Sequence, residues 1–141
     1  GLTFCAGSFS AGEHNDCVAM AKQFADRTHF VHLRSCYIFP NGNFTEASHL
    51  GGRGHLIELC RIFEKAEQEG KCNSGRRLPM RVDHGMTFTD EPGGVFDESN
   101  HGHNAGYTLL GRMFAMGQIQ GVIATVDDEL GIKYKQPGFY D

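Results

Sequence analysis

The sequence predicts an α/β fold, and more narrowly the last three strand–helix units of a (β/α)8 TIM barrel. Three short apolar runs are each followed by a loop and then by a segment with helical spacing, which is typical of parallel strands joined by crossover helices. The loops after the strands are long and the returns to the next strand are short, as on the carboxyl face of a barrel. A closed barrel needs about eight units and roughly 250 residues. The 141 residues therefore predict a segment of a larger protein, whose partner is the upstream part of the same barrel.

Three runs are expected to be buried strands, at residues 2–5, 28–34 and 78–84. Each run is rich in apolar or β-branched residues and is bounded by polar or glycine-rich sequence. A helix capped by Asn15 is expected after the first strand, because apolar residues recur there at helical spacing (Cys17, Met20, Ala21 and Phe24).

The second expected helix has the clearest pattern, with one apolar stripe that ends before Gly70 (Leu56, Leu59, Cys60, Phe63 and Ala66). The third, at about 107–120, is apolar nearly all round, so we expect it to be largely buried. Residues 1–122 are thus assigned to the barrel units and residues 122–141 to a C-terminal extension or tail.

Composition excludes several classes of protein. The net charge of −4 is opposite to that of a polybasic nucleic-acid binder. No run reaches the ~18 apolar residues of a spanning helix, and no signal peptide precedes the first strand, so we expect a cytoplasmic protein without a membrane partner. The five cysteines are odd in number and form no C-x-x-C pair, which favours reduced and mostly buried thiols over disulfides.

Residues capable of chemistry gather where the predicted strands end. Cys5 ends the first, His32 and Arg34 end the second, and Arg81 and Asp83 end the third. Because side chains alternate along a strand, the faces that carry Cys5, His32 and Asp83 can converge at one end of a parallel sheet.

A thiolate, an imidazole and a carboxylate together suit Mn²⁺, Fe²⁺, Co²⁺ or Zn²⁺ rather than Ca²⁺ or Mg²⁺. Each residue also has an ordinary structural explanation. Cys5 suits a small buried hydrophobe, His32 a hydrogen-bonded core histidine, and Asp83 a turn residue. Their coincidence at three strand ends favours the shared metal site.

Five segments of the chain resemble the C-terminal portion of mannonate dehydratase, in order: GLTFCAGS (1–8), HFVHLRS (29–35), FTEASHLGG (44–52), MRVDHG (80–85) and GYTLLGRMFAMGQIQGV (106–122). The resemblance implies a (β/α)8 barrel of the xylose-isomerase-like type with bound Mn²⁺ or Fe²⁺. It also implies a lyase of glucuronate catabolism that dehydrates D-mannonate to 2-dehydro-3-deoxy-D-gluconate.

The resemblance also implies residue roles. It places the metal ligands on Cys5, His32 and Asp83, and the acid/base pair on His84 and Tyr107. Residues that contact the sugar acid are then Arg34, His49 and Arg81. A further histidine ligand of the family lies on an earlier strand, so we expect the isolated segment to be inactive.

Proton abstraction beside a carboxylate, followed by loss of the neighbouring hydroxyl, needs one base and one acid. The sequence does not decide which of His84 and Tyr107 is the base. Arg34 offers a planar fork for the substrate carboxylate. Two alternatives remain open: a metal-dependent sugar isomerase or epimerase on the same barrel, and a non-catalytic metal-binding fragment. A homo-oligomer is also expected.

Overall fold

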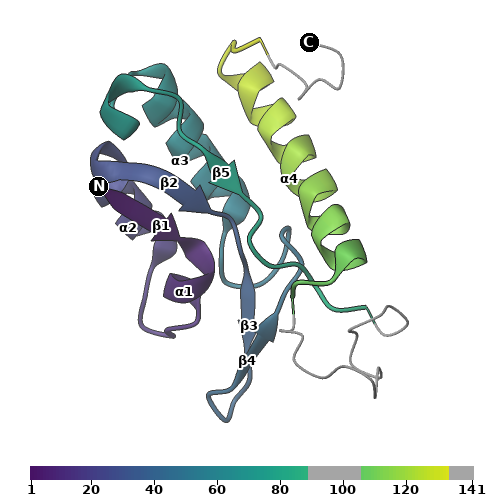
Figure 1. The fold of residues 1–141 in the computed structure, drawn as a ribbon. Helices are drawn as coiled ribbons and strands as arrows, with labels where there is room; N and C mark the ends of the chain where they lie inside the picture. The colour runs from purple at the N-terminus through teal and green to yellow at the C-terminus, as the bar shows by residue number, and fades with distance from the viewer. Residues whose placement is uncertain (89–105, 134–141) are drawn as a thin grey trace.

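The fold is taken from a computed structural model, which describes residues 1–88 and 106–133. Three parallel strands form a sheet in the order β1-β2-β5, and they lie side by side in Figure 1: β1 (Leu2–Cys5), β2 (Thr28–His32) and β5 (Met80–Arg81). The predicted α/β class and its three parallel strands are confirmed. The second and third strands are shorter than predicted, because the chain leaves the sheet after His32 and after Arg81.

The connection after β2 contains an antiparallel hairpin, which extends away from the sheet in Figure 1. Its strands are β3 (Cys36–Ile38) and β4 (Phe44–Glu46), with Cys36 opposite Glu46. The hairpin brings residues of the loop back to the carboxyl end of the sheet, where Ala47 donates a backbone hydrogen bond to Ser35.

The connection between β1 and β2 holds three short helices: α1 (Ala6–Ser10), α2 (Cys17–Phe24) and the 3-10 helix η1 (Ala25–Arg27). The N-cap of α2 is Asp16, whose carboxylate accepts two backbone N–H groups of the first turn at 3.0 Å. The prediction of Asn15 as the cap is wrong by one residue. The Asn15 amide instead donates to the Phe9 carbonyl at 3.0 Å.

Helix α3 (Leu56–Gln68) buries the whole predicted stripe, Leu56, Leu59, Cys60, Phe63 and Ala66. Gly70 follows the helix with a φ of 65°, as predicted for its stop. The Phe63 ring meets the Phe4 ring of β1 edge to face, with centroids 5.2 Å apart. The core therefore lies between one face of the sheet and its helices, while the other face carries the side chains of Cys5, Phe30 and His32.

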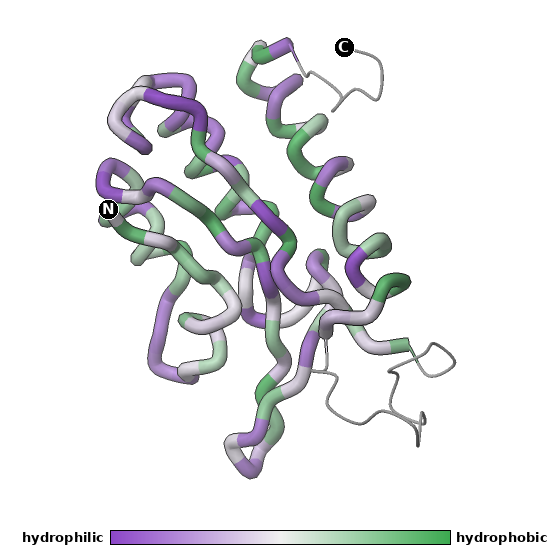
Figure 2. Tube along the Cα trace, in the orientation of Figure 1, coloured by the Kyte–Doolittle hydropathy of each residue, from purple (hydrophilic) through white to green (hydrophobic). Residues whose placement is uncertain are grey.

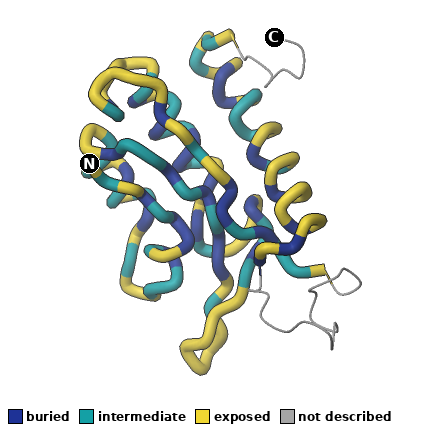
Figure 3. Tube along the Cα trace, in the orientation of Figure 1, coloured by how far each residue is buried: buried dark blue, intermediate teal, exposed yellow. Residues whose placement is uncertain are grey.

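Helix α4 (Leu109–Glu129) is the longest element and differs from the prediction. It buries one side, Gly111, Ala115, Ile119, Val126 and Asp127, and leaves large apolar side chains exposed, namely Leu109, Leu110, Met113, Phe114 and Met116. Figures 2 and 3 show this combination of apolar and exposed residues along its first half. The expectation of a largely buried helix is wrong, because the described residues pack against one side of α4, with α3 as its main partner. The boundary predicted at residue 122 falls inside α4.

By length and composition alone, α4 resembles a membrane-spanning helix, with 22% of its most apolar window buried. One such helix is weak support for a membrane protein, because core helices of soluble proteins share these properties. The absence of a membrane partner stays a prediction.

All five cysteines are free thiols. Cys17, Cys36, Cys60 and Cys72 are buried and Cys5 is partly exposed. The prediction of reduced, mostly buried thiols is confirmed.

Candidate metal centre and acid–base site

The candidate metal centre lies at the carboxyl end of the parallel sheet. Cys5 is the last residue of β1 and pairs in register with His32, the last residue of β2, and His32 pairs with Arg81 of β5. Asp83 lies two residues beyond Arg81, at a left-handed φ of 59°. Asparagine and aspartate tolerate this backbone region better than most residues. The sheet register therefore aligns the first two donors, and the bend at Asp83 brings in the third.

The predicted convergence of Cys5, His32 and Asp83 is confirmed. One donor atom from each, a sulfur, an imidazole nitrogen and a carboxylate oxygen, all lie within 4.8 Å of one another. His32 Nδ1 is 3.6 Å from Asp83 Oδ2, and their side chains are 21% and 9% exposed. Donors that share an ion at ~2.0–2.3 Å lie within roughly 4.6 Å of each other. The arrangement thus fits a transition ion after at most a small side-chain adjustment, and the role of these residues as ligands stays a prediction.

Two further contacts support this centre. Arg81 Nη2 donates to Asp83 Oδ1 at 2.8 Å, which leaves Asp83 Oδ2 on the side of His32. The Ser8 hydroxyl donates to Cys5 Sγ at 3.1 Å. Arg81, predicted to contact substrate, here orients the carboxylate of the candidate ligand Asp83. Ser8 was missed, although its place three residues after Cys5, in the turn that starts α1, puts it within reach.

The two predicted acid/base residues lie in contact. The rings of His84 and Tyr107 have centroids 4.3 Å apart, and His84 Nε2 is 3.9 Å from Asp83 Oδ2. Gly106 lets the chain pass close to His84, because it has a φ of 90° and a Cβ there would lie 2.8 Å from His84 Nδ1. Residues far apart in the sequence are thus held together beside the metal-ligand cluster.

Glu46 of β4 joins two of the predicted residues. Its Oε1 lies 2.9 Å from His84 Nδ1, and its carboxylate accepts from Arg34 Nε at 2.9 Å and from Arg34 Nη2 at 2.6 Å. The Arg34 fork, predicted to hold a substrate carboxylate, is therefore engaged by Glu46 in this structure. Sequence reasoning missed Glu46. The available signal was a lone carboxylate between aromatic and small residues in FTEASHLGG.

His49 lies beneath the site rather than at its opening. It is 2% exposed, and its Nε2 is 3.1 Å from the Val82 carbonyl, next to Asp83. Burial lowers its pKa, although the hydrogen bond to Val82 opposes this shift. In this structure His49 therefore supports the segment that carries Asp83 and His84, and its predicted contact with substrate stays a prediction.

The arrangement combines two chemical capacities. Three donors of mixed hardness can hold a divalent ion, and an imidazole next to a phenol can move protons beside it. The side chains of His32 and His84 are partly exposed, at 21% and 16%.

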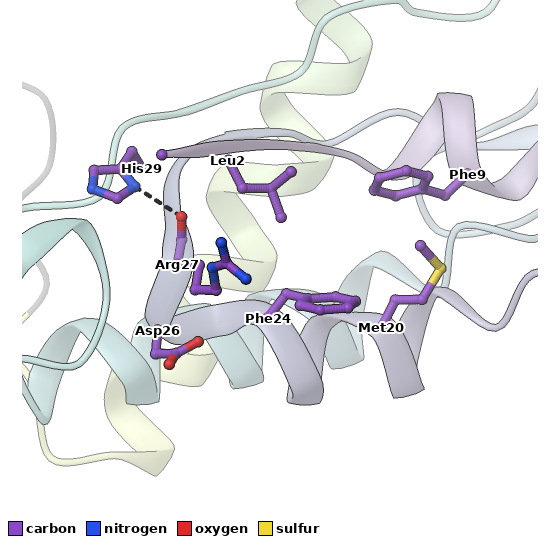
Figure 4. A pocket seen from close by; sticks show the side chains of 8 residues that line it. Leu2, Phe9, Met20, Phe24, Asp26, Arg27 and His29 are labelled. Carbon is purple, nitrogen blue, oxygen red and sulfur yellow. Dashed lines mark hydrogen bonds between the residues drawn. The ribbon is translucent and has the colours of Figure 1, made fainter.

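A separate pocket of about 540 Å³ lies at the opposite, amino end of β1 and β2. Figure 4 shows Leu2 and Phe9 facing Phe24 and Met20 across it. None of the predicted site residues lines this pocket. It is therefore separate from the candidate metal centre.

Comparison with known proteins points to one family. A protein-family model described as D-mannonate dehydratase (UxuA) matches residues 1–133. Mannonate dehydratase 2 of Agrobacterium fabrum is 38% identical over 132 residues, which is 92% of this chain and 31% of that protein. Mannonate dehydratase of Saccharophagus degradans is 37% identical over 129 residues, with 90% and 31% coverage. The chain thus spans about a third of the length of these relatives.

A solved structure supports the fold. The crystal structure of mannonate dehydratase from Streptococcus suis serotype2 matches the whole chain with a TM-score of 0.73 at 19% identity. The match covers 37% of that structure. At this identity the likeness shows a shared fold.

Proposed function

Since this chain belongs to the D-mannonate dehydratase family, we propose that it supplies part of the active site of an enzyme that converts D-mannonate to 2-dehydro-3-deoxy-D-gluconate and water. The observation that supports this best is the convergence of Cys5, His32 and Asp83 within 4.8 Å, next to the His84–Tyr107 pair. An enzyme that must stabilise an enediolate and also move two protons needs both groups at one place.

The proposed setting is a (β/α)8 barrel to which this chain contributes three consecutive strands. Parallel strands with helices on one face and ligand residues at their carboxyl ends are what such a barrel requires. The proposal also accounts for the apolar residues that α4 leaves exposed, since the remainder of the barrel would cover them. A homo-oligomeric state and a cytoplasmic location stay predictions.

Cys5, His32 and Asp83 would hold the metal, with Mn²⁺ or Fe²⁺ as the proposed ion. When bound, such an ion supplies Lewis-acid stabilisation of negative charge on the substrate carboxylate. Arg81 maintains the orientation of the Asp83 carboxylate through its 2.8 Å hydrogen bond. The Ser8 hydroxyl does the same for the Cys5 sulfur.

His84 and Tyr107 would carry the protons. One accepts the proton from the carbon next to the carboxylate, and the bonding electrons move into the enediolate. The other donates a proton to the neighbouring hydroxyl, whose bond to carbon breaks as water leaves and a carbon–carbon double bond forms. The resulting enol then becomes the ketone by shifting its hydroxyl proton to carbon, so all atoms are accounted for.

The proposal is tested with the protein expressed at the full length that its gene encodes, assayed for water loss from D-mannonate with added Mn²⁺. Cys5→Ser should lower the metal content measured by elemental analysis. His84→Ala should retain the metal and reduce turnover by roughly 10²–10⁴-fold, the usual contribution of a general acid or base. The matched control is His29→Ala, since His29 lies at the amino end of β2, away from the site.

Two outcomes would overturn the proposal. Equal loss of metal in Cys5→Ser and His84→Ala would contradict the division of roles. An isomeric sugar acid formed without loss of water would identify a metal-dependent isomerase or epimerase instead.

A further inference from the structure

Glu46 occupies a place that neither the metal-ligand set nor the acid/base pair explains. It sits at the end of β4, and its side chain is only 9% exposed. A carboxylate this far removed from water needs strong partners. It has two, the Arg34 guanidinium and the His84 imidazole, and both lie within hydrogen-bond distance of its Oε1 atom.

The hydrogen bond to Glu46 determines which His84 nitrogen carries the proton. A carboxylate paired with a guanidinium accepts hydrogen bonds and does not donate them. The Nδ1 atom, 2.9 Å from Glu46 Oε1, is therefore the protonated nitrogen of the neutral ring. This leaves Nε2, 3.9 Å from Asp83 Oδ2, as the nitrogen with a free lone pair beside the metal-ligand cluster.

Glu46 is itself held in a fixed orientation. Arg34 binds both carboxylate oxygens, at 2.9 and 2.6 Å, and this planar two-point contact fixes the plane of the carboxylate. Glycines allow the close packing around it. A Cβ at Gly7 would collide with the Arg34 side chain, and a Cβ at Gly106 would lie 3.1 Å from Glu46 Cγ.

We propose that Glu46 is a positioning residue of this site: held by Arg34, it accepts a hydrogen bond from His84 Nδ1–H and so directs Nε2 at the metal-ligand cluster. This inference rests on the proposed function for the role of His84. It also gives Arg34 a different task from that predicted, since its fork holds Glu46 rather than substrate.

The sharpest test compares Glu46→Leu with Glu46→Gln. Leucine offers no acceptor to Nδ1, so the neutral ring is free to carry its proton on Nε2, 3.9 Å from the Asp83 carboxylate. Glutamine can keep an oxygen at the Oε1 position, which faces both Arg34 Nη2 and His84 Nδ1, so it should retain the Nδ1–H form. We expect the kcat of Glu46→Leu to fall by roughly 10²–10⁴-fold, as for a catalytic histidine held in the wrong tautomer, and that of Glu46→Gln to fall much less. KM and metal content should remain within about threefold, because neither substrate nor metal loses a contact.

The tautomer is measured directly by ¹⁵N NMR of histidine-labelled full-length protein loaded with diamagnetic Zn²⁺, with the His84 signals assigned by their loss in His84→Gln. The parent protein and Glu46→Gln should show Nδ1–H, and Glu46→Leu should show Nε2–H. Glu58→Leu, on the exposed face of α3, is the matched control and should change neither tautomer nor kcat.

An unchanged His84 tautomer in Glu46→Leu would overturn the inference, and so would a rise in KM at constant kcat. A changed tautomer with unchanged kcat would also overturn it, because the orientation would then not serve the reaction. If the parent protein does not dehydrate D-mannonate, the proposed function fails, whereas a tautomer change in Glu46→Leu still supports Glu46 as the residue that orients His84.

Discussion

The two long helices α3 and α4 lie against each other but bury their apolar residues in different ways. In α3 the buried residues form one stripe, and charged residues occupy most of the remaining surface, with Ile57 as an exposed apolar exception. In α4 small and branched residues face the core, and large apolar residues remain on the other sides. A one-sided pattern is satisfied by partners within the described residues, whereas an all-round apolar pattern requires contacts from elsewhere.

The helices also differ in their relation to the site. The chain that leads into α4 carries Tyr107, and Gly111 in its first turn lies against the segment that follows His84. Helix α3 begins at Leu56 after the N-cap residue His55, whose φ of 50° is left-handed and whose side chain makes no cap hydrogen bond. Changes in α3 should therefore affect stability alone, and changes at the start of α4 should affect both stability and activity.

The largest expected effect is that of Phe63→Ala in α3. The Phe63 side chain is fully buried and packs edge to face on Phe4, so its loss should lower the free energy of unfolding by about 3–5 kcal/mol. Urea unfolding of the full-length protein measures this change. The control is Ile57→Ala, which removes a 40% exposed side chain of the same helix and should change stability by less than about 0.5 kcal/mol. Similar costs for both variants would mean that α3 is not packed on one side only.

Gly111→Ala tests the link between α4 and the site. A Cβ here would collide with the Met86 carbonyl oxygen and lie 3.0 Å from Thr108 Oγ1, so the two segments must move apart. We expect a loss of about 1–3 kcal/mol from overpacking. We also expect a loss of turnover of roughly 10²-fold, the size of effect that a displacement of catalytic groups by about 1 Å can have. Steady-state kinetics at saturating metal measures this loss. Full turnover in a destabilised variant would show that the start of α4 does not position the site residues.

The α3–α4 interface should respond to pH through Glu64. Burial, with added repulsion from Asp127 of α4, raises the pKa of Glu64 to about 7, and burial also raises the pKa of Asp127. The folded state then holds a proton that the unfolded state releases near pH 4.5, so stability falls as pH rises from about 4.5 to 7. Glu64→Gln should remove about 1–2 kcal/mol of this pH-dependent loss of stability. The value is smaller than the full pKa shift implies, because Glu64 remains partly exposed to solvent.

This prediction is checked by urea unfolding of the parent protein and Glu64→Gln at pH 5 and pH 8. The stabilising effect of the variant should be larger at pH 8. An equal effect at both pH values would contradict the prediction, because Glu64 would then have the ordinary pKa of an exposed carboxyl group.

The smallest effect is expected from Gly117→Ala in the middle of α4. Nothing lies within 4 Å of a Cβ at this position among the described residues, and alanine is the better helix former. Stability should rise by about 0.5–1 kcal/mol, measured by thermal unfolding. A decrease would show that another part of the protein packs directly against this side of α4.

Sequence reasoning predicted those features that depend on local spacing. The stripe of α3 needs only a period of 3.6 residues, and the convergence of Cys5 with His32 needs only the in-register ends of two parallel strands. The cap of α2 was misplaced because Asn15 and Asp16 are adjacent and both are good cap residues.

The missed features depend on contacts between distant parts of the chain. Glu46 reaches His84 only because the β3–β4 hairpin carries it back over the sheet, and 38 residues separate the two in sequence. The burial of His49 depends on the position of Val82, and the exposure of α4 depends on what surrounds it. No local sequence pattern predicts these contacts between distant residues.

The cysteine distribution has a practical consequence for chemical labelling. Burial raises the pKa of Cys17, Cys36 and Cys72, and that of Cys60 to about 12, so these four thiols stay protonated near neutral pH and react poorly with alkylating agents. Cys5 is the partly exposed thiol of the chain. An iodoacetamide footprint read by peptide mass spectrometry would then report on Cys5 in particular, and protection by added metal would measure occupancy of the centre without any assay of turnover.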